Sequence, residues 1–287
     1  KFKMIIWLAS YPKSGNTWVR ALLTSYYFSK KGDFNFELLK KIDQFPSVNH
    51  YKNDKDLYLK PESNAEKWLS KQKEINKDNK IRFFKTHNAN CIINGNKFTD
   101  NQNTLGAIYI VRDPRNVITS LKHHYQISND DALLFMRNNK KILFEKQGNR
   151  YLGFTPLFSW STHVDSWINC KSFPILNVRY EDLQFKTFET LKIIINFIKK
   201  ISKSTNLFDR ERAKKSIKAC DFANLKNLEK KNGFDEAIVK KDGSMKINFF
   251  NLGQDNDYKK ILKPDLINEM NEIYNKQLLK FSYEKSN

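Results

Sequence analysis

The sequence predicts an α/β fold, in which one domain over residues 1–287 holds a central, mostly parallel β-sheet flanked by helices. Four short runs of apolar and β-branched residues favour buried strands, and they lie at residues 4–9, 81–86, 105–111 and 174–179. Near-continuous apolar runs of this length are typical of parallel strands covered on both faces. Segments with helical spacing follow the runs, so that strand, turn and helix alternate along the chain.

Helical periodicity directly follows three of these runs. The predicted helices span residues 16–28, 115–125 and 187–199, and the last has a clear apolar stripe. Apolar residues three and four positions apart lie on one face of a helix, which they bury against the sheet. A further helix over 264–279 closes the chain, and Pro264 suits its first turn because proline has no N–H to leave unpaired.

The composition is that of a folded protein rather than a disordered one. Hydrophobic residues make up 40% and charged residues 29% of the 287 residues, which is enough apolar material for a large core. No run approaches the roughly 20 apolar residues that a membrane-spanning helix needs, so we expect no membrane span. Residues 1–9 combine basic residues with an apolar stretch, but this stretch is too short for a signal peptide.

Cysteine usage indicates a reducing compartment. Cys91, Cys170 and Cys220 are odd in number and widely spaced, and no CxxC pair occurs. Neither a disulfide framework nor a zinc site fits this pattern. We therefore expect a cytoplasmic protein that needs no metal.

The formal net charge of +20 has two interpretations. Lysine and arginine together number 51 against 31 acidic residues, and only nine of the 51 are arginine. A strongly basic chain can bind nucleic acid or an anionic membrane. The lysines are spread over the whole chain, however, which favours a compositional bias with most of them on solvated faces. We therefore expect no specific nucleic-acid partner, although a basic surface would help to gather an anionic small molecule.

Residues 9–18, ASYPKSGNTW, join the first predicted strand to the first predicted helix. A helix N-terminus binds phosphate well because its free N–H groups and its positive dipole end face the anion. Gly15 allows a close backbone approach, and Lys13 adds a full positive charge. Ser14 and Thr17 add hydroxyl donors. A turn that merely connects two elements is the alternative, and the lysine before the glycine differs from the GxxxxGK[ST] loop of Mg–ATP sites.

The same segment resembles the 5′-phosphosulfate loop of the sulfotransferases that use 3′-phosphoadenosine 5′-phosphosulfate (PAPS), whose usual form is YPKSGTTW. Seven of the eight positions match, and Asn16 replaces the first threonine of that form. The resemblance implies a P-loop-NTPase-like fold, PAPS as the co-substrate, Trp18 against the adenine and Lys13 at the oxygen between phosphate and sulfate. The cofactor-binding residues implied by this loop are Lys13, Ser14, Gly15, Asn16, Thr17 and Trp18.

A second anion site is predicted where the third strand ends. Residues 108–120, IYIVRDPRNVITS, place Arg112 at the carboxyl end of the strand, because Asp113 and the proline after it stop the strand and start a helix. Ligands of open α/β sheets bind at such strand ends. The segment resembles the 3′-phosphate motif of the same family, which implies that Arg112 and Ser120 hold the 3′-phosphate. A structural pairing of Arg112 with Asp113 or Asp131 is the alternative.

A base is predicted after the second strand, in the segment KTH that ends at His87. An imidazole titrates near neutral pH and suits removal of a proton from an acceptor hydroxyl, although a lone histidine at a strand end is more often structural. The triplet resembles the KTHLP segment of the family, which implies that His87 is the catalytic base and that Lys85 assists. Residues 88–89 are Asn-Ala instead of Leu-Pro, so the loop beside the acceptor should differ. His123 and His124 are the next candidates for the base.

Two aromatic residues have weaker support. Tyr180, in the segment RYED after the fourth strand, resembles the family residue that helps to position the nucleotide. Phe222 resembles the family's phenylalanine that packs on adenine. From the residues alone, both could equally be ordinary core aromatics.

The late part of the family pattern is only partly kept. The family closes over the 3′-phosphate with RKGxxGDW, and residues 251–258 read NLGQDNDY, so Gly253 stays as an implied nucleotide contact while two basic residues are lost. A charge-assisted hydrogen bond contributes on the order of 1.5–3 kcal/mol, so this loss should weaken 3′-phosphate binding. Lys240, Lys241 or Lys246 could replace the missing cations. The resemblance as a whole covers about residues 5–283.

These patterns predict a sulfotransferase that moves the sulfuryl group of PAPS in line to a hydroxyl or amine of a small acceptor. His87 would take the proton of the acceptor, and Lys13 would stabilise the charge on the departing oxygen. Lys85 would assist at the sulfuryl group, which the hydroxyls of Ser14 and Thr17 would orient. Three alternatives stay open: a nucleotide or small-molecule kinase on a related fold, a non-enzymatic binder of nucleic acid or another anionic ligand, and a family member that has lost its activity.

The sequence specifies neither the acceptor nor the oligomeric state. Loops 33–63 and 128–158 should shape the acceptor site. The first carries aromatic residues that suit an apolar or phenolic acceptor but equally suit a core, namely Phe34, Phe36, Phe45, Tyr51 and Tyr58. The family's KxxxTVxxxE dimer segment has no clear counterpart near the C-terminus, so no oligomeric state is predicted.

Overall fold

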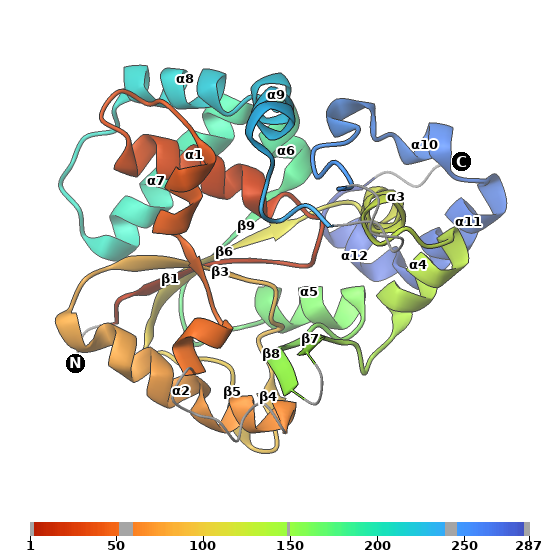
Figure 1. The fold of residues 1–287 in the computed structure, drawn as a ribbon, viewed down its shortest axis with the longest axis horizontal. Coiled ribbons are helices and arrows are strands. Elements are labelled where there is room, and N and C mark those ends of the chain that lie inside the picture. Colours follow the sequence, from red (N-terminus) through yellow and green to blue (C-terminus); the bar gives the residue numbers. More distant parts are fainter. Residues whose placement is uncertain (1–2, 52–59, 148–149, 239–245, 284–287) are drawn as a thin grey trace.

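The computed structural model describes residues 3–51, 60–147, 150–238 and 246–283 (Figure 1). Its centre is a five-stranded sheet in the order β2-β3-β1-β6-β9, in which each neighbouring pair of strands is parallel. The strands are β1 (Ile5–Ser10), β2 (Asp43–Gln44), β3 (Arg82–Thr86), β6 (Thr104–Val111) and β9 (Ile175–Arg179). The prediction of an α/β fold with a parallel sheet is therefore confirmed.

Strand β1 occupies the middle of this sheet. Its Trp7 lies between Phe84 of β3 and Ala107 of β6, and every residue of β1 is buried. The strands that follow β1 in the chain go first to one side of it and later to the other. In open α/β sheets a crevice forms outside the carboxyl ends of the strands at such a reversal. Ser10, at the carboxyl end of β1, therefore lies where a ligand site is expected.

Helices cover both faces of the sheet, as Figure 1 shows. One face is covered by α1 (Asn16–Phe28), α6 (Tyr180–Phe185), α7 (Thr187–Ser202), α8 (Arg210–Ala219) and α9 (Phe222–Asn232). The opposite face is covered by α2 (Asn64–Ile75) and α5 (Trp160–Ile168). Toward the carboxyl ends of the strands lie α3 (Pro114–Tyr125), α4 (Asn129–Arg137), α10 (Tyr258–Ile261), α11 (Pro264–Ile273) and α12 (Asn275–Lys280).

Small elements fill the connections between these layers. Two antiparallel hairpins are β4 (Ile92–Ile93) with β5 (Asn96–Lys97) and β7 (Ile142–Gln147) with β8 (Arg150–Pro156). Short 3-10 turns are η1 (Phe36–Lys41), η2 (Val48–Tyr51), η4 (Pro61–Ser63), η5 (Asn76–Asp78) and η6 (Gly253–Asp255).

Alternation along β1 creates two hydrophobic cores, one on each face of the sheet. Ile6 and Leu8 point into the core beneath α1 and α7, whereas Trp7 points into the other core with Trp68 and Trp167. Successive side chains of a strand point to opposite faces, so a fully apolar strand serves both cores. The two cores fix β1 from both sides and so give its carboxyl end a rigid base.

The predicted strands and their helices agree with the structure to within a few residues. Strand β2 was not predicted, because two residues at a sheet edge leave no pattern to recognise. The closing helix begins with Pro264 in its first turn, as predicted, but it breaks into α11 and α12 at Tyr274. There the backbone turns to φ −104° and ψ 12°, and the buried ring of Tyr274 packs on Trp160.

Helix length also bears on membrane insertion. Among the residues that the structure describes, none of the helices has both the length and the apolar character needed to cross a bilayer.

Candidate active site

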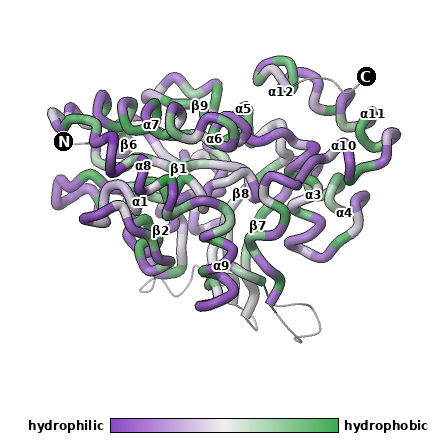
Figure 2. Tube along the Cα trace, turned by 90° about the horizontal axis from the view of Figure 1, so that it is seen from above, coloured by the Kyte–Doolittle hydropathy of each residue, from purple (hydrophilic) through white to green (hydrophobic). Residues whose placement is uncertain are grey.

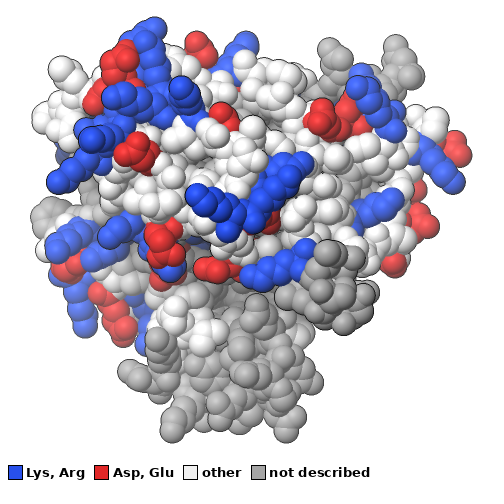
Figure 3. All heavy atoms as spheres, turned by 45° about the horizontal axis from the view of Figure 1, so that its top comes forward, with Lys and Arg blue, Asp and Glu red and all other residues white. Residues whose placement is uncertain are grey.

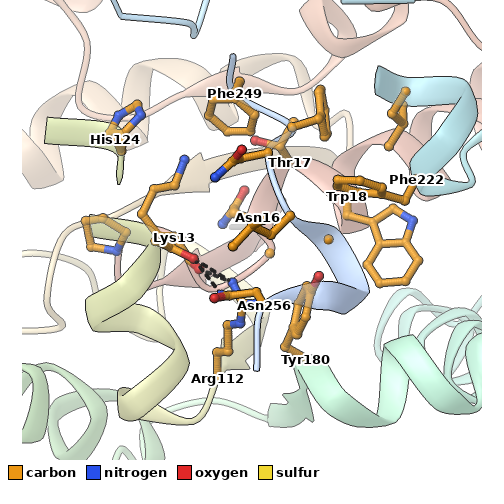
Figure 4. A pocket seen from close by; sticks show the side chains of 18 of the residues that line it. Lys13, Asn16, Thr17, Trp18, Arg112, His124, Tyr180, Phe222, Phe249 and Asn256 are labelled. Carbon is orange, nitrogen blue, oxygen red and sulfur yellow. Dashed lines mark hydrogen bonds between the residues drawn. The ribbon is translucent and has the colours of Figure 1, made fainter. Parts of the chain in front are cut away.

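A cavity of about 490 Å³ opens at the carboxyl ends of β1, β3 and β6. The predicted site residues that line it are Lys13, Gly15, Asn16, Thr17, Trp18, Lys85, His87, Arg112, Ser120, Tyr180, Phe222 and Gly253. Ser14 is the exception, since it does not line the cavity; its buried hydroxyl has no hydrogen-bond partner among the described residues. Figure 4 shows Lys13, Arg112 and Tyr180 around one space, with Trp18 and Phe222 side by side at its edge.

The turn after β1 has a backbone that only a few residue types tolerate. Gly15 adopts a φ of +98°, and a Cβ at this position would lie 2.5 Å from the ring of Tyr180. Lys13 also has a positive φ, 65°. Because Gly15 caps α1 without a side chain, the first N–H groups of the helix have no side-chain partner there. The start of α1 is thus open to an anionic ligand.

Arg112 links the end of β6 to this turn. Its Nη1 donates to the carbonyl oxygen of Lys13 at 3.2 Å and to Oγ of Ser120 at 3.1 Å. Its guanidinium carbon lies 4.1 Å from the centre of the Tyr180 ring, and its buried Nε has no partner within the described ranges. Donors of Arg112 are therefore available to a ligand.

The alternative of a structural pairing for Arg112 is not what the structure contains. Asp113 instead pairs with Arg115, whose Nη2 lies 2.7 Å from its Oδ2. Asp131 accepts a hydrogen bond from Ser128 at 2.8 Å. Both acids named in that alternative are bonded elsewhere.

His87 has a defined tautomer. Its Nδ1 lies 2.8 Å from the carbonyl oxygen of Ser10, which can only accept, so Nδ1 carries the proton. Nε2 therefore keeps its lone pair. Oγ of Ser10 lies 3.3 Å from the same nitrogen. The amide nitrogen of Asn16 donates to that Oγ at 3.1 Å and to the carbonyl oxygen of Leu8 at 2.9 Å.

His163 supports His87 from behind, a position that the sequence did not reveal. Its Nε2 lies 3.1 Å from the carbonyl oxygen of His87, and its Nδ1 lies 2.9 Å from the hydroxyl of Tyr109. Burial lowers the pKa of His163 to about 4, so it is neutral near pH 7. The segment around it reads as an ordinary amphipathic helix, which gave no signal of this contact.

Burial and nearby cations also lower the pKa values of two histidines and one lysine that line the cavity. Burial and the adjacent Lys85 lower the pKa of His87 to about 3. Burial and the Lys13 ammonium lower the pKa of His124, which lines the same cavity from α3, to about 3. Burial and Arg112 lower the pKa of Lys13 to about 7. An anion bound here would offset the cations and raise all three values.

Glu236 is a charged residue of the cavity that the sequence did not predict. Its Oε1 lies 3.1 Å from Nζ of Lys85 and 2.5 Å from Nη1 of Arg20. Its Oε2 accepts a hydrogen bond from the hydroxyl of Thr17 at 3.0 Å. Burial raises the pKa of Glu236, but Lys85 and Arg20 outweigh burial and hold it far below its ordinary value. Glu236 is therefore ionised.

Aromatic rings form the other end of the cavity. The rings of Trp18 and Tyr180 lie 5.8 Å apart, and Nε1 of Trp18 donates to the carbonyl oxygen of Cys220 at 2.9 Å. Gly253 has a φ of +57°, and a Cβ there would lie 2.6 Å from the ring of Phe222. Tyr180 and Phe222 thus line the cavity, and their contact with a nucleotide stays a prediction.

The segment that lacks the two basic residues is tied to its neighbours by amides. Asn256 donates to Oγ of Ser120 at 3.1 Å and accepts from Thr119 at 2.6 Å. Nζ of Lys226 donates to the carbonyl oxygen of Asn251 at 3.0 Å. Lys246 is exposed and does not line the cavity. Lys240 and Lys241 lie outside the described residues.

Of the described residues in the loops expected to shape the acceptor site, two line this cavity. Gln44 lines it from the first loop and Leu143 from the second. Phe45 and Tyr51 are buried in the core, and Phe36 packs against Phe234 at 4.5 Å between ring centres. These aromatic residues act as core residues in the structure. Tyr58 lies outside the described residues.

A comparison with protein families gives a match over residues 4–282 to the model described as the sulfotransferase domain. The chain belongs to the sulfotransferase domain family. The resemblance found in the sequence is thereby confirmed, and the match covers nearly the whole chain. A search of curated proteins found no match.

Solved structures share this fold at low sequence identity. A retinol dehydratase in complex with androsterone and the inactive cofactor PAP has 14% identity, covers 97% of this chain and 82% of its own, and superposes with a TM-score of 0.61. The same kind of enzyme with retinol and PAP has 16% identity, the same coverage and a TM-score of 0.57. A mouse sulfotransferase, SULT7A1, complexed with PAP has 19% identity, coverage of 97% and 85%, and a TM-score of 0.56.

Proposed function

We propose that this sulfotransferase-domain chain uses PAPS as the donor and transfers its sulfuryl group to a hydroxyl or amine of a small acceptor. One observation carries the proposal. The open start of α1 with Lys13, the guanidinium of Arg112 and the bare Nε2 of His87 all belong to a single cavity. A cation pair, a helix start and a base together match a polyanionic donor and a protonated nucleophile.

The residues of the cavity fit such a donor. The 5′-phosphosulfate would lie on the backbone of residues 14–18, and the adenine would lie between Trp18 and Phe222. The 3′-phosphate would accept hydrogen bonds from Arg112, whose Nε lacks a partner within the described residues. Ser120, whose Oγ accepts hydrogen bonds from Arg112 and Asn256, would add its hydroxyl hydrogen there. The solved relatives with PAP support this choice of nucleotide.

The proposed step is an in-line displacement at sulfur. The acceptor oxygen or nitrogen forms a bond to sulfur as the bond from sulfur to the 5′-phosphate oxygen breaks. The electron pair of the breaking bond leaves with that oxygen as part of PAP. The acceptor proton goes to Nε2 of His87, and the imidazolium then donates through Nδ1 to the carbonyl oxygen of Ser10. Lys13 and Lys85 stabilise charge on the departing oxygen and on the sulfuryl group. Cations that are already held in place stabilise the negative charge that develops in the transition state.

Removal of the base is the direct test of this assignment. His87→Ala should lower kcat by about 10²- to 10⁴-fold, because general-base catalysis contributes that much. PAP affinity measured by calorimetry should stay at the wild-type value, since His87 does not contact the nucleotide. If His124→Ala lost activity while His87→Ala kept it, the base would be His124.

The donor is tested separately from the base. Calorimetry of the wild-type chain should show tight binding of PAP and none of Mg–ATP at the same concentrations. Binding of Mg–ATP without PAP would favour a kinase on the same sheet. Binding of PAP without transfer to any member of a panel of alcohols, phenols and amines would indicate a family member that has lost its activity.

A further inference from the structure

A carboxylate inside a site for a polyanionic donor needs a physical explanation. Glu236 touches the ammonium of Lys85 at 3.1 Å, which the proposed function places at the sulfuryl group, and it accepts a hydrogen bond from the hydroxyl of Thr17 at 3.0 Å. Two accounts are possible. Glu236 either imitates the donor and leaves when the donor binds, or it stays and orders the groups around it.

Arg20 decides between these accounts. Its side chain is 7% exposed, and its Nη2 donates to the carbonyl oxygens of Leu39 and Ile42 at 3.2 Å each. In the part of the chain that the structure describes, Glu236 is its acidic partner. Withdrawal of Glu236 would leave a buried guanidinium without counter-charge, which is strongly destabilising. The carboxylate is therefore anchored from behind and has a reason to stay.

An anchored carboxylate orders both of its other partners. The side chain of Lys85 is 9% exposed and leaves β3 toward the cavity, where Glu236 is the acid that it pairs with. Lysine has four rotatable bonds, so a fixed acceptor at its end reduces the positions that the ammonium samples. Oε2 fixes the Thr17 hydroxyl in the same way.

We propose that Glu236 is a positioning residue for sulfuryl transfer, anchored by Arg20 so that it holds the Lys85 ammonium at the phosphosulfate end of the cavity. This inference rests on the proposed function. It does not require that Glu236 touch the donor. It explains why an acid occurs among cations that would otherwise repel one another and be mobile.

The titratable and charged groups that face Glu236 come from several elements. The cations are Arg20 of α1, Lys13 of the preceding turn and Lys85 of β3, and the neutral imidazoles are His87 after β3 and His124 of α3. Burial lowers the pKa of Lys85, and Glu236 opposes that shift. Burial and Lys85 lower the pKa of His87, and Glu236 again opposes the shift. Loss of the carboxylate therefore moves both pKa values downward.

Glu236→Gln tests the proposal because it removes the charge and nearly keeps the shape. We expect kcat to fall at least tenfold, with PAP affinity unchanged or tighter by calorimetry. Activity needs His87 neutral and both Lys13 and Lys85 protonated, and Glu236 raises the pKa of all three groups, so both limbs of the pH profile of kcat should move to lower pH. Asp235→Asn, at the exposed neighbouring position, should change neither kcat nor the profile.

A second variant covers the case in which Glu236→Gln fails to fold. Glu236→Asp keeps a counter-charge near Arg20 but is too short to reach Lys85 and Thr17 together, so kcat should fall while Tm is retained. Wild-type kcat and an unmoved pH profile in a folded variant would overturn the proposal. A higher kcat together with tighter PAP binding would also overturn it, since Glu236 would then merely compete with the donor. If the wild-type chain binds no PAP, the proposed function fails instead.

Discussion

Asn16 is the residue at which the loop after β1 departs from the usual family form, and its bonds explain what the change does. The amide nitrogen is used within the protein, because it donates to the carbonyl oxygen of Leu8 and to Oγ of Ser10. The carbonyl oxygen of Ser10 in turn fixes Nδ1 of His87. Asn16 thus connects the start of α1 to the residue that orients the proposed base, and only its backbone is left for phosphate.

Asn16→Ala should therefore impair turnover more than nucleotide binding. Two hydrogen bonds of about 0.5–1.5 kcal/mol each are lost, and a loosened His87 should lower kcat by roughly tenfold. Steady-state kinetics and calorimetry with PAP measure the two effects. A loss of PAP affinity with unchanged kcat would show instead that the side chain binds the donor.

The residues that the sequence identified share one property, which is that their place along the chain fixes their place in space. Lys13 follows β1, His87 follows β3 and Arg112 ends β6, so the topology alone brings them to one edge of the sheet. Glu236 and His163 could not be found in this way. Their roles depend on which buried partner they meet across the fold, and no local pattern encodes that choice.

Residues 251–258 lack the two basic residues of the family form, and an amide side chain keeps this segment bonded to α3. The family form has two basic residues where this chain has Asn251 and Leu252, and Leu252 is 40% exposed. Asn256 instead bonds to Ser120 and to Thr119 of α3. The connection to α3 is thus kept without a cation from this segment at the proposed 3′-phosphate site.

Restoring the two cations should tighten binding of the 3′-phosphate specifically. Asn251→Arg combined with Leu252→Lys should raise PAP affinity at least tenfold, because each charge-assisted hydrogen bond contributes about 1.5–3 kcal/mol. The affinity for adenosine 5′-phosphate, which lacks the 3′-phosphate, should stay unchanged in calorimetry. Asn248→Arg, at an exposed position nearby, is the matched control. Equal gains for both nucleotides would mean that the added charge acts only at long range.

The elements themselves divide in the same manner into predictable and unpredictable ones. β1, β3, β6 and β9 were predicted because a strand buried on both faces must be apolar throughout. The break between α11 and α12 was not predicted, since no glycine or proline marks it. It arises where Tyr274 turns into the core against Trp160, which is a tertiary contact.

The face of the molecule drawn in Figure 3 carries its positive charge in a dispersed form. Figure 3 shows lysine and arginine in several separate groups on one face, with acidic side chains between them. Figure 2 shows hydrophilic residues along much of α9, at the outside of the fold. Both hydrophobic cores share one sheet, which supports our proposal of a single domain. A net charge of +20 creates a long-range electrostatic field around the molecule.

Such a field should steer the anionic donor and leave the chemical step alone. Raising the ionic strength from about 0.01 M to 0.15 M shortens the Debye length from about 30 Å to about 8 Å, which screens distant lysines but not the buried cations of the cavity. We therefore expect kcat/KM for PAPS to fall several-fold while kcat stays constant, as stopped-flow and steady-state assays can measure. Duplex DNA should compete with PAPS at low salt only, because non-specific binding weakens steeply as counterions are added. Competition by DNA that persists at 0.15 M salt would instead assign the surface charge to a nucleic-acid partner.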